Sequence, residues 1–581
     1  MRTSLKFCST ILALSAALAA MPATPALANG DRTDNTVTIT DGVAGPYLGW
    51  KIFDGNFMED SYTPAPNKPG YGNYGITPNK MGGLSLNKDL SKNGFDFQAQ
   101  LTTILNKYLP NEKKITLVAD AQKNAELLAN GFKNAMEAGD WGFANEIAGV
   151  LIANNITPTV SKTSTSDTVS FTDLKTGYYI FAADTRNPEN YSNNKAVTSA
   201  ILTPVIGNVS IKSKVNVPTV EKSVKDNTPG TDFDGDYGKM AIAGLIADGN
   251  LPKIDSVTYK IDGTISRNIE DFETYKYVLH DTLPTGLDVT ADELKAGGSW
   301  KLTIKAIDPT HANGVDITSS FTPTVETTGT GKSRVSKISI ASNDLKEALK
   351  KAGISLNYDN ASQIHIVAEY TPVYDENDIT NLYANYGQAH AGQKNSVYIE
   401  YSNNPYTGGT PSTSTTPPNE TLVYAIKLRV NKIKEGGGTL KNAQFTLTDK
   451  TTGKTIGKNV TAANDGTFFF TGLDAGHVYV LTESVVPNGY KSVDPIEFSI
   501  KAVQGADKKT VASIQVEGIK DPSHASQFVV NNSTLEVTAN ITNIPGPNMP
   551  GTGTGQQTAG IVLAGGLLIL SIYFLRPRET D

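Results

Sequence analysis

The amino-acid sequence predicts a mainly β chain built from tandem β-sandwich domains, the first of which carries a helical insertion. Short runs that alternate apolar and polar residues recur along most of the chain, and turn-forming residues separate them. Two stretches, 97–108 and 119–153, have helical spacing of their apolar residues instead. Between the two terminal segments lie about 520 residues, enough for roughly three domains.

Residues 1–28 have the features of a secretory signal peptide. Two basic residues precede an apolar run at 7–20, and a small-residue cleavage site ends at Ala28. Cys8, the single cysteine of the sequence, lies in this segment. We therefore expect a secreted mature chain without disulfides, which its cores or another kind of covalent link must stabilise.

Residues 29–212 are predicted to form an N-terminal β domain. The helical stretches contain many alanine, leucine and lysine residues, and Asp120 and Asp140 lie near their expected starts. A loop rich in glycine, proline and asparagine precedes them at 60–95. The expected strands lie on both sides of the helices, at 36–40, 47–53, 168–171, 177–181 and 200–211.

Residues 213–405 are predicted to form a second β-sandwich, and 406–420 a linker. The second domain contains short alternating runs with turns between them and one short helical piece at 343–351. The linker prediction depends on composition, because this segment is rich in serine, threonine, proline and glycine. The clearest strand signals of the domain lie at 217–224, 257–261, 275–279, 300–304, 364–370 and 397–401.

Residues 421–548 are predicted to form a third domain with an immunoglobulin-like number of strands. Seven short strand signals occur within about 120 residues, separated by glycine, asparagine and aspartate turns. They lie at 423–430, 443–448, 467–470, 478–482, 496–500, 512–516 and 535–541.

Residues 549–581 combine a short polar motif with a membrane-type segment. The apolar run 558–575 is at the short end of what can span a bilayer, and two arginines follow it directly, which is a stop-transfer arrangement. The pentapeptide before it lies in turn-prone sequence that a processing enzyme can reach. It reads Met549-Pro550-Gly551-Thr552-Gly553.

Composition argues against several classes of function. The formal net charge of −7 argues against nucleic-acid binding. The six histidines are scattered, so no zinc site or other cofactor is expected. The sequence has no nucleophile elbow and no phosphate-binding loop, and we expect a protein that is not an enzyme.

Short motifs occur in the second and third domains. Those of the third are Arg429–Lys432, Gly466–Leu473, Tyr479–Ser484, Pro487–Tyr490 and Ile541–Asn543, and those of the second are Pro218–Lys222, His280–Leu287 and Tyr401–Pro405. With these motifs the third domain resembles CnaB-type domains of Gram-positive surface proteins, and the second resembles the isopeptide-forming middle domain of sortase-assembled pilins. The terminal pentapeptide resembles the LPxTG sorting signal with Met549 in place of leucine. The resemblance covers essentially the whole mature chain and is weakest over the first domain.

The resemblance implies an amide bond between a lysine and an asparagine in each of these two domains. Burial disfavours the charged forms of the lysine and of a neighbouring acid, so the amine becomes a nucleophile and the acid polarises the asparagine carbonyl. Contact inside a fold supplies a large effective concentration. The third domain would use Lys432, Asn543 and Glu483, and the second would use Lys222, Asn403 and Asp281. Asn404 is the competing partner of Lys222, and strand alternation favours Asn403.

The resemblance further implies the backbone subunit of a cell-wall-anchored pilus. Sortase would cleave between Thr552 and Gly553 and join Thr552 to an amine of peptidoglycan or of the next subunit. The acceptor lysine of pilins lies in a Tyr-Pro-Lys-Asn motif, of which only a lysine remains here: Lys214 in the aligned position, with Lys212 as its rival. An ancillary pilin or an unpolymerised wall-anchored adhesin is the alternative. The sequence does not name a host ligand, and it leaves open a plain membrane anchor.

Overall fold

The computed structural model describes most of the chain between residues 33 and 546. The predicted signal peptide, the sorting motif 549–553 and the apolar run 558–575 lie outside the described residues. Within the described part, no helix is long and apolar enough to cross a membrane. The described ranges are 33–56, 62–64, 74–76, 82–92, 94–137, 142–186, 197–205, 207–213, 217–227, 237–242, 245–248, 251–254, 256–375, 377–378, 381–382, 392–407, 412–463 and 466–546.

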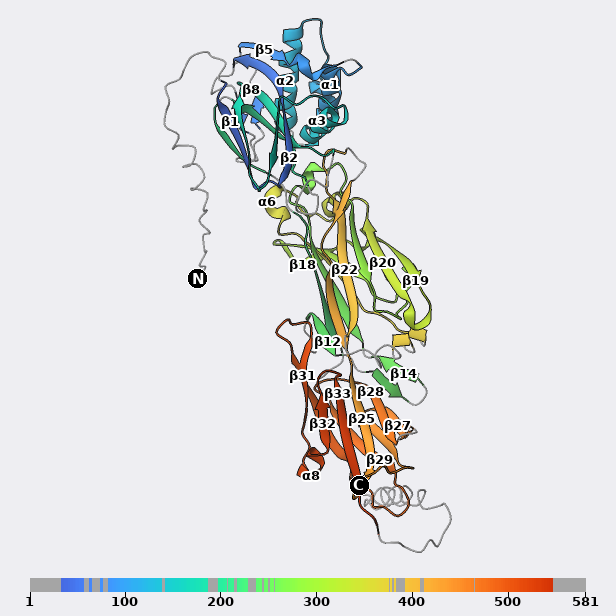
Figure 1. Cartoon of the computed structure of the whole chain (residues 1–581). Helices are drawn as coiled ribbons and strands as arrows, with labels where there is room; N and C mark the ends of the chain where they lie inside the picture. The colour runs from blue at the N-terminus through green and yellow to red at the C-terminus, as the bar shows by residue number, and fades with distance from the viewer. Residues whose placement is uncertain are drawn as a thin grey trace, which may run out of the picture.

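Three bodies follow one another in chain order along an elongated molecule (Figure 1). Each has its own buried apolar cluster, and the chain is mainly β. The predicted fold class, tandem β-sandwich domains of which the first contains helices, is therefore confirmed.

The N-terminal domain consists of two sheets with three helices packed beside them (Figure 1). The first sheet has the order β10-β1-β7, in which β1 pairs in parallel with β10. The second has the order β5-β2-β8-β9, with β6 also paired to β2, and β3 and β4 form a separate hairpin. The strands are β1 (Asn35–Thr40), β2 (Gly45–Asn56), β3 (Tyr62–Pro64), β4 (Tyr74–Ile76), β5 (Gly82–Leu86), β6 (Val160–Ser164), β7 (Val169–Leu174), β8 (Gly177–Ala183), β9 (Ile201–Val205) and β10 (Val209–Lys212).

The helices α1 (Phe97–Tyr108), α2 (Ala121–Glu137) and α3 (Gly142–Ala153) form where the apolar spacing predicts them. Asp96 caps α1, because its side chain accepts a hydrogen bond from the Ala99 amide at 3.1 Å. The apolar stripes of α1 and α3 are buried in the same cluster as the strands β2 and β8.

The middle domain is a sandwich of two facing sheets. One has the order β11-β15-β21-β17-β18, and the other β12-β24-β22-β16-β20-β19, with β23 paired to β22. A small hairpin of β13 and β14 stands apart from both. The strands are β11 (Val220–Asp226), β12 (Met240–Ile242), β13 (Leu245–Asp248), β14 (Leu251–Ile254), β15 (Val257–Thr264), β16 (Tyr277–Thr282), β17 (Thr303–Asp308), β18 (His311–Asp316), β19 (Thr322–Thr328), β20 (Val335–Ser342), β21 (His365–Tyr370), β22 (Gln393–Ser402), β23 (Thr413–Thr415) and β24 (Asn419–Tyr424), with short helices α4 (Ala291–Leu294), α5 (Leu345–Lys351) and α6 (Tyr358–Ala361).

The C-terminal domain is a second sandwich, with sheets β28-β25-β33-β32 and β27-β26-β29-β30-β31. Its first and last strands, β25 and β33, are parallel neighbours along their whole length. The strands are β25 (Ile426–Lys434), β26 (Gln444–Asp449), β27 (Lys454–Thr461), β28 (Thr467–Leu473), β29 (Val478–Val485), β30 (Ile496–Gln504), β31 (Val511–Glu517), β32 (Phe528–Asn531) and β33 (Glu536–Asn543), with one short helix, α8 (Pro522–Ala525).

The segment 406–420 differs from the predicted linker. It supplies β23 and the start of β24, both of which pair with β22 of the middle domain. At its beginning, Tyr406 is buried in the N-terminal cluster and its hydroxyl accepts a hydrogen bond from the Ala183 amide at 3.2 Å. Amino-acid composition does not predict these contacts, because the hydrogen bonds between paired strands join backbone groups and form with many kinds of side chain.

Candidate crosslinking sites

Two lysines are buried among the described residues, and each belongs to a different sandwich. Lys222 lies on β11 of the middle domain and Lys432 on β25 of the C-terminal domain, and both side chains are fully excluded from solvent. A charged amine in an apolar core is unstable unless it is paired or loses its charge. The groups around these two lysines therefore decide what the sites can do.

The C-terminal site brings Lys432, Glu483 and Asn543 into mutual contact. Lys432 Nζ lies 3.1 Å from Glu483 Oε1 and donates a hydrogen bond to Asn543 Oδ1. Asn543 Nδ2 donates to both carboxylate oxygens of Glu483, at 3.0 and 3.1 Å. The parallel register of β25 and β33 sets Lys432 opposite Ile541, so Asn543 lies two residues farther along the neighbouring strand on the same face. Glu483 reaches both side chains from β29 in the facing sheet.

The surroundings of Lys432 favour its neutral form. Burial lowers the pKa of the Lys432 amine, and the nearby Glu483 carboxylate partly opposes this shift. The ring of Phe445 lies 5.4 Å from Nζ and closes the site on one side. An amine that can lose its proton, held against an amide carbonyl, is the arrangement that nucleophilic attack requires.

The middle-domain site pairs Lys222 with Asp281. Lys222 Nζ lies 2.6 Å from Asp281 Oδ2, and neither side chain is exposed to solvent. Burial lowers the pKa of the Lys222 amine, and Asp281 opposes this shift. The rings of Tyr259 and Tyr370 each lie 5.3 Å from Nζ. Lys222 belongs to one sheet and Asp281, on β16, to the other, so the pair bridges the two layers.

Asn403, the expected partner of Lys222, is not brought to this site. Asp281 lies opposite Val397 in the register of β16 and β22, and Asn403 lies beyond the end of β22. At about 3.4 Å per residue, Asn403 is roughly 20 Å farther along the strand. Its carbonyl instead accepts a hydrogen bond from the Val197 amide at 3.2 Å, at the junction with the N-terminal domain. The rival Asn404 accepts a hydrogen bond from the Tyr406 amide with its side chain.

Asn395 lies near Lys222 and Asp281, in the position that the sequence analysis predicts for Asn403. Its side chain is fully buried, and its Nδ2 donates to the Tyr370 hydroxyl at 2.8 Å, the same hydroxyl that lies 3.3 Å from Lys222 Nζ. Sequence reasoning missed this residue although strand alternation puts it on the same face of β22 as Val397. An asparagine within the buried face of an alternating strand is a signal that could have revealed it, because such a polar group needs a partner there.

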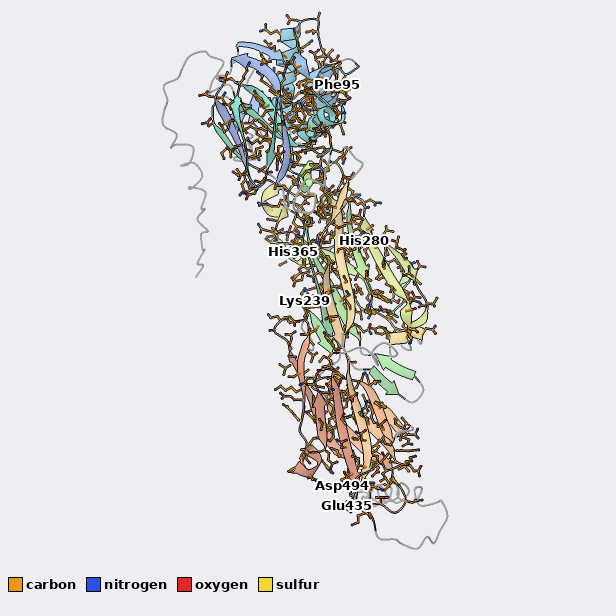
Figure 2. The ribbon with its side chains drawn as sticks, in the orientation of Figure 1. Phe95, Lys239, His280, His365, Glu435 and Asp494 are labelled. Atoms are coloured by element: carbon orange, nitrogen blue, oxygen red, sulfur yellow. The ribbon has the colours of Figure 1, made fainter. Side chains whose placement is uncertain are left out.

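A third lysine has similar contacts but is not buried. Lys239 Nζ lies 3.0 Å from both Asn419 Oδ1 and Glu221 Oε1. Its side chain is 20% exposed and that of Glu221 is 69% exposed. Figure 2 labels Lys239 in the part of the middle domain nearest the C-terminal domain. Water reaches this group, so it is not enclosed in an apolar core as Lys222 and Lys432 are.

The residues expected to take part in polymerisation are only partly described. Lys212 ends β10 on the surface and forms an ion pair with Asp41 at 2.8 Å, with both side chains about half exposed. Lys214 and the sorting motif Met549 to Gly553 lie outside the described residues. No group of side chains in the described part of the chain has the composition of a metal site.

One family model matches part of the chain. Residues 426–514 match the model described as the prealbumin-like fold domain of SpaA. This range covers most of the C-terminal domain and contains Lys432 and Glu483, but it ends before Asn543. No curated protein matches the chain.

Several solved structures of pilins resemble the chain at low identity. The T6 backbone pilin of Streptococcus pyogenes aligns with a TM-score of 0.46 and 14% identity, covering 90% of this chain and 100% of that one. The major pilin SpaD of Corynebacterium diphtheriae gives 0.40 and 16%, covering 89% and 99%. The major pilin SpaA of the same organism gives 0.38 and 11%, covering 88% and 100%. The resemblance to Gram-positive pilins that the sequence predicts is thus confirmed.

Proposed function

We propose that this protein is the backbone subunit of a sortase-assembled, wall-anchored pilus whose middle and C-terminal domains each close an intramolecular Lys–Asn isopeptide bond. The observation that carries the proposal is the environment of the two buried lysines, each held beside a carboxylate and near an asparagine in an apolar core. We take the bonds to join Lys432 to Asn543 and Lys222 to Asn395.

The reaction at the C-terminal site follows from its contacts. The Lys432 ammonium gives one proton to Glu483, and the neutral amine attacks Cγ of Asn543. The Nζ–Cγ bond forms and the Cγ–Nδ2 bond breaks, while a second proton moves from Nζ to Nδ2. Glu483, which touches both nitrogens, returns its proton to the leaving group, so that ammonium departs and a neutral amide remains. No cofactor takes part, and each site reacts once.

The crosslinks account for the absence of disulfides in the mature chain. In the C-terminal domain the bond would join residues 111 positions apart, on the first and last strands. A tensile force that enters β25 would then pass through the amide into β33 without loading the residues between them. Covalent closure of such a long loop also restricts the unfolded state, as a disulfide does.

The bonds are tested by the intact mass of the mature protein, residues 29–552. We expect a mass that lacks two ammonia equivalents relative to the sequence, and one equivalent in Asp281→Ala or Glu483→Ala. A wild-type mass equal to that of the linear sequence would rule out both bonds.

Polymerisation is tested at the acceptor lysine. We expect Lys214→Ala to abolish the ladder of high-mass species that resist boiling in SDS, while the matched variant Lys212→Ala retains it. The measurement is an immunoblot of wall extracts from a strain that also makes the sortase. A single wall-linked band in the wild type and in both variants would favour the alternative, an ancillary pilin or unpolymerised adhesin, which the degenerate acceptor motif keeps open.

A further inference from the structure

The two candidate sites differ in how the carboxylate reaches the amide nitrogen that must leave. At the C-terminal site, Glu483 contacts both the amine of Lys432 and Nδ2 of Asn543. At the middle-domain site, Asp281 contacts the amine of Lys222 but no described hydrogen bond joins it to Asn395. Aspartate is one methylene shorter than glutamate, and Asp281 Oδ1 is buried without a hydrogen-bond partner among the described residues.

The hydroxyl of Tyr370 occupies the gap between Asp281 and Asn395. It donates to Asp281 Oδ2 at 2.7 Å and accepts from Asn395 Nδ2 at 2.8 Å, and it also lies 3.3 Å from Lys222 Nζ. One hydroxyl therefore touches the attacking nitrogen, the leaving nitrogen and the carboxylate. The described contacts of the C-terminal site include no hydroxyl in this role.

We propose that Tyr370 is a catalytic residue of the middle domain, which relays a proton to the departing amide nitrogen of Asn395. This inference rests on the proposed Lys222–Asn395 bond and adds a fourth group to that site. It also gives the two domains different chemistry, with a glutamate alone in one and an aspartate plus a tyrosine in the other.

The proton relay conserves every proton at the middle-domain site. The Lys222 ammonium gives one proton to Asp281, and the amine attacks Cγ of Asn395. In the tetrahedral intermediate Nδ2 has a free electron pair, so the Tyr370 hydroxyl can donate its proton to Nδ2 and take a proton from Nζ. The Cγ–Nδ2 bond then breaks, the Nζ–Cγ amide remains, and ammonia leaves with the proton that Asp281 held. Tyr370 and Asp281 end in their starting states.

The packing around Tyr370 suits a fixed relay. The ring stacks on Trp300 with centroids 5.8 Å apart and packs against Tyr259 at 5.4 Å, so its hydroxyl has little freedom to move. Burial and the nearby Asp281 raise the pKa of Tyr370 well above its usual value. The hydroxyl therefore keeps its proton at neutral pH and can pass it on only when another is received.

The test compares Tyr370→Phe with wild type in the mature chain. Each protein is isolated in denaturant before it has folded, and folding is started by dilution. Samples are quenched in acid at intervals and digested, and mass spectrometry then measures the formation of each bond separately. Phenylalanine retains the ring packing, and the C-terminal bond is an internal control in the same molecule. Tyr277→Phe is the matched control, because it removes another buried hydroxyl of the same domain, whose described hydrogen bond goes to the Thr264 carbonyl.

Protease resistance identifies the Tyr370→Phe protein that has folded. In this folded protein we expect the middle-domain bond to form at least about 10²-fold more slowly than in wild type, while the C-terminal bond forms at an unchanged rate. Formation at the wild-type rate would overturn the relay and leave the proposed bonds standing. Absence of both ammonia losses in wild type would instead overturn the proposed function.

A second variant separates proton transfer from packing. Fluorotyrosine at position 370 keeps the shape of the ring but makes the hydroxyl more acidic. We expect the rate of the middle-domain bond to change while that of the C-terminal bond does not. An unchanged rate would mean that Tyr370 only supports the structure.

Discussion

Replacement of Lys432 by methionine is expected to lower the unfolding temperature of the C-terminal domain by tens of degrees. The proposed bond would close a loop of about 110 residues, and by analogy with a disulfide this would stabilise the domain by about 5 kcal/mol. Each kcal/mol shifts the melting temperature of a domain of 100–150 residues by roughly 4 °C. Methionine fills the same space without leaving a buried charge, so the fall measures the loss of the bond. Differential scanning calorimetry of the mature protein provides the measurement.

Glu483→Gln is the informative comparison for this prediction. It also prevents the bond, but it leaves the Lys432 amine buried without its carboxylate, and an uncompensated buried charge costs about 3–5 kcal/mol more. We therefore expect Glu483→Gln to melt below Lys432→Met. Lys434→Met, at the exposed end of the same strand, is the control and should melt like wild type. A Lys432→Met protein that melts within a few degrees of wild type would contradict the crosslink.

Asn395→Ala is expected to make the middle domain extensible under force. In wild type the load would pass from β11 through the proposed Lys222–Asn395 bond into β22, so the residues between them would bear no tension. Without the asparagine, Lys222 keeps its ion pair with Asp281 but cannot form the amide. Single-molecule pulling should then release several hundred ångströms of chain, at about 3.3–3.6 Å per residue.

The matched variant for this experiment is Asn403→Ala. Asn403 lies beyond β22 and contacts the N-terminal domain through its backbone, so its loss should leave the middle domain inextensible. The opposite pattern, extension in Asn403→Ala and none in Asn395→Ala, would restore the assignment expected from the sequence.

The sequence predicts the class of fold and much of the C-terminal site. Strand alternation and turn residues are local signals, and so is the helical spacing at 97–108, which coincides with α1. Lys432 and Asn543 lie in the motifs of the first and last strands, so the family resemblance is sufficient to predict them as crosslinking residues. The structure brings them together with Glu483, and the bond itself stays a prediction.

The partner of Lys222 could not be predicted from the sequence because it depends on register. Alternation correctly identifies one face of β22, but it cannot tell which residue on that face lies level with Asp281. The pairing of Asp281 with Val397 decides this, and it puts Asn395 two residues away and Asn403 six. Tyr370 was missed for a related reason, since it belongs to β21 in the opposite sheet and no sequence motif links it to Asp281.

We infer that burial converts two lysines into nucleophiles that react with neighbouring asparagines. Tandem mass spectrometry of a proteolytic digest of the mature protein tests it most directly. We predict two branched peptides, one joining Lys222 to Asn395 and the other Lys432 to Asn543, and a linear peptide for the partly exposed Lys239 beside Asn419. Recovery of Lys222 and Lys432 only in linear peptides would contradict the account.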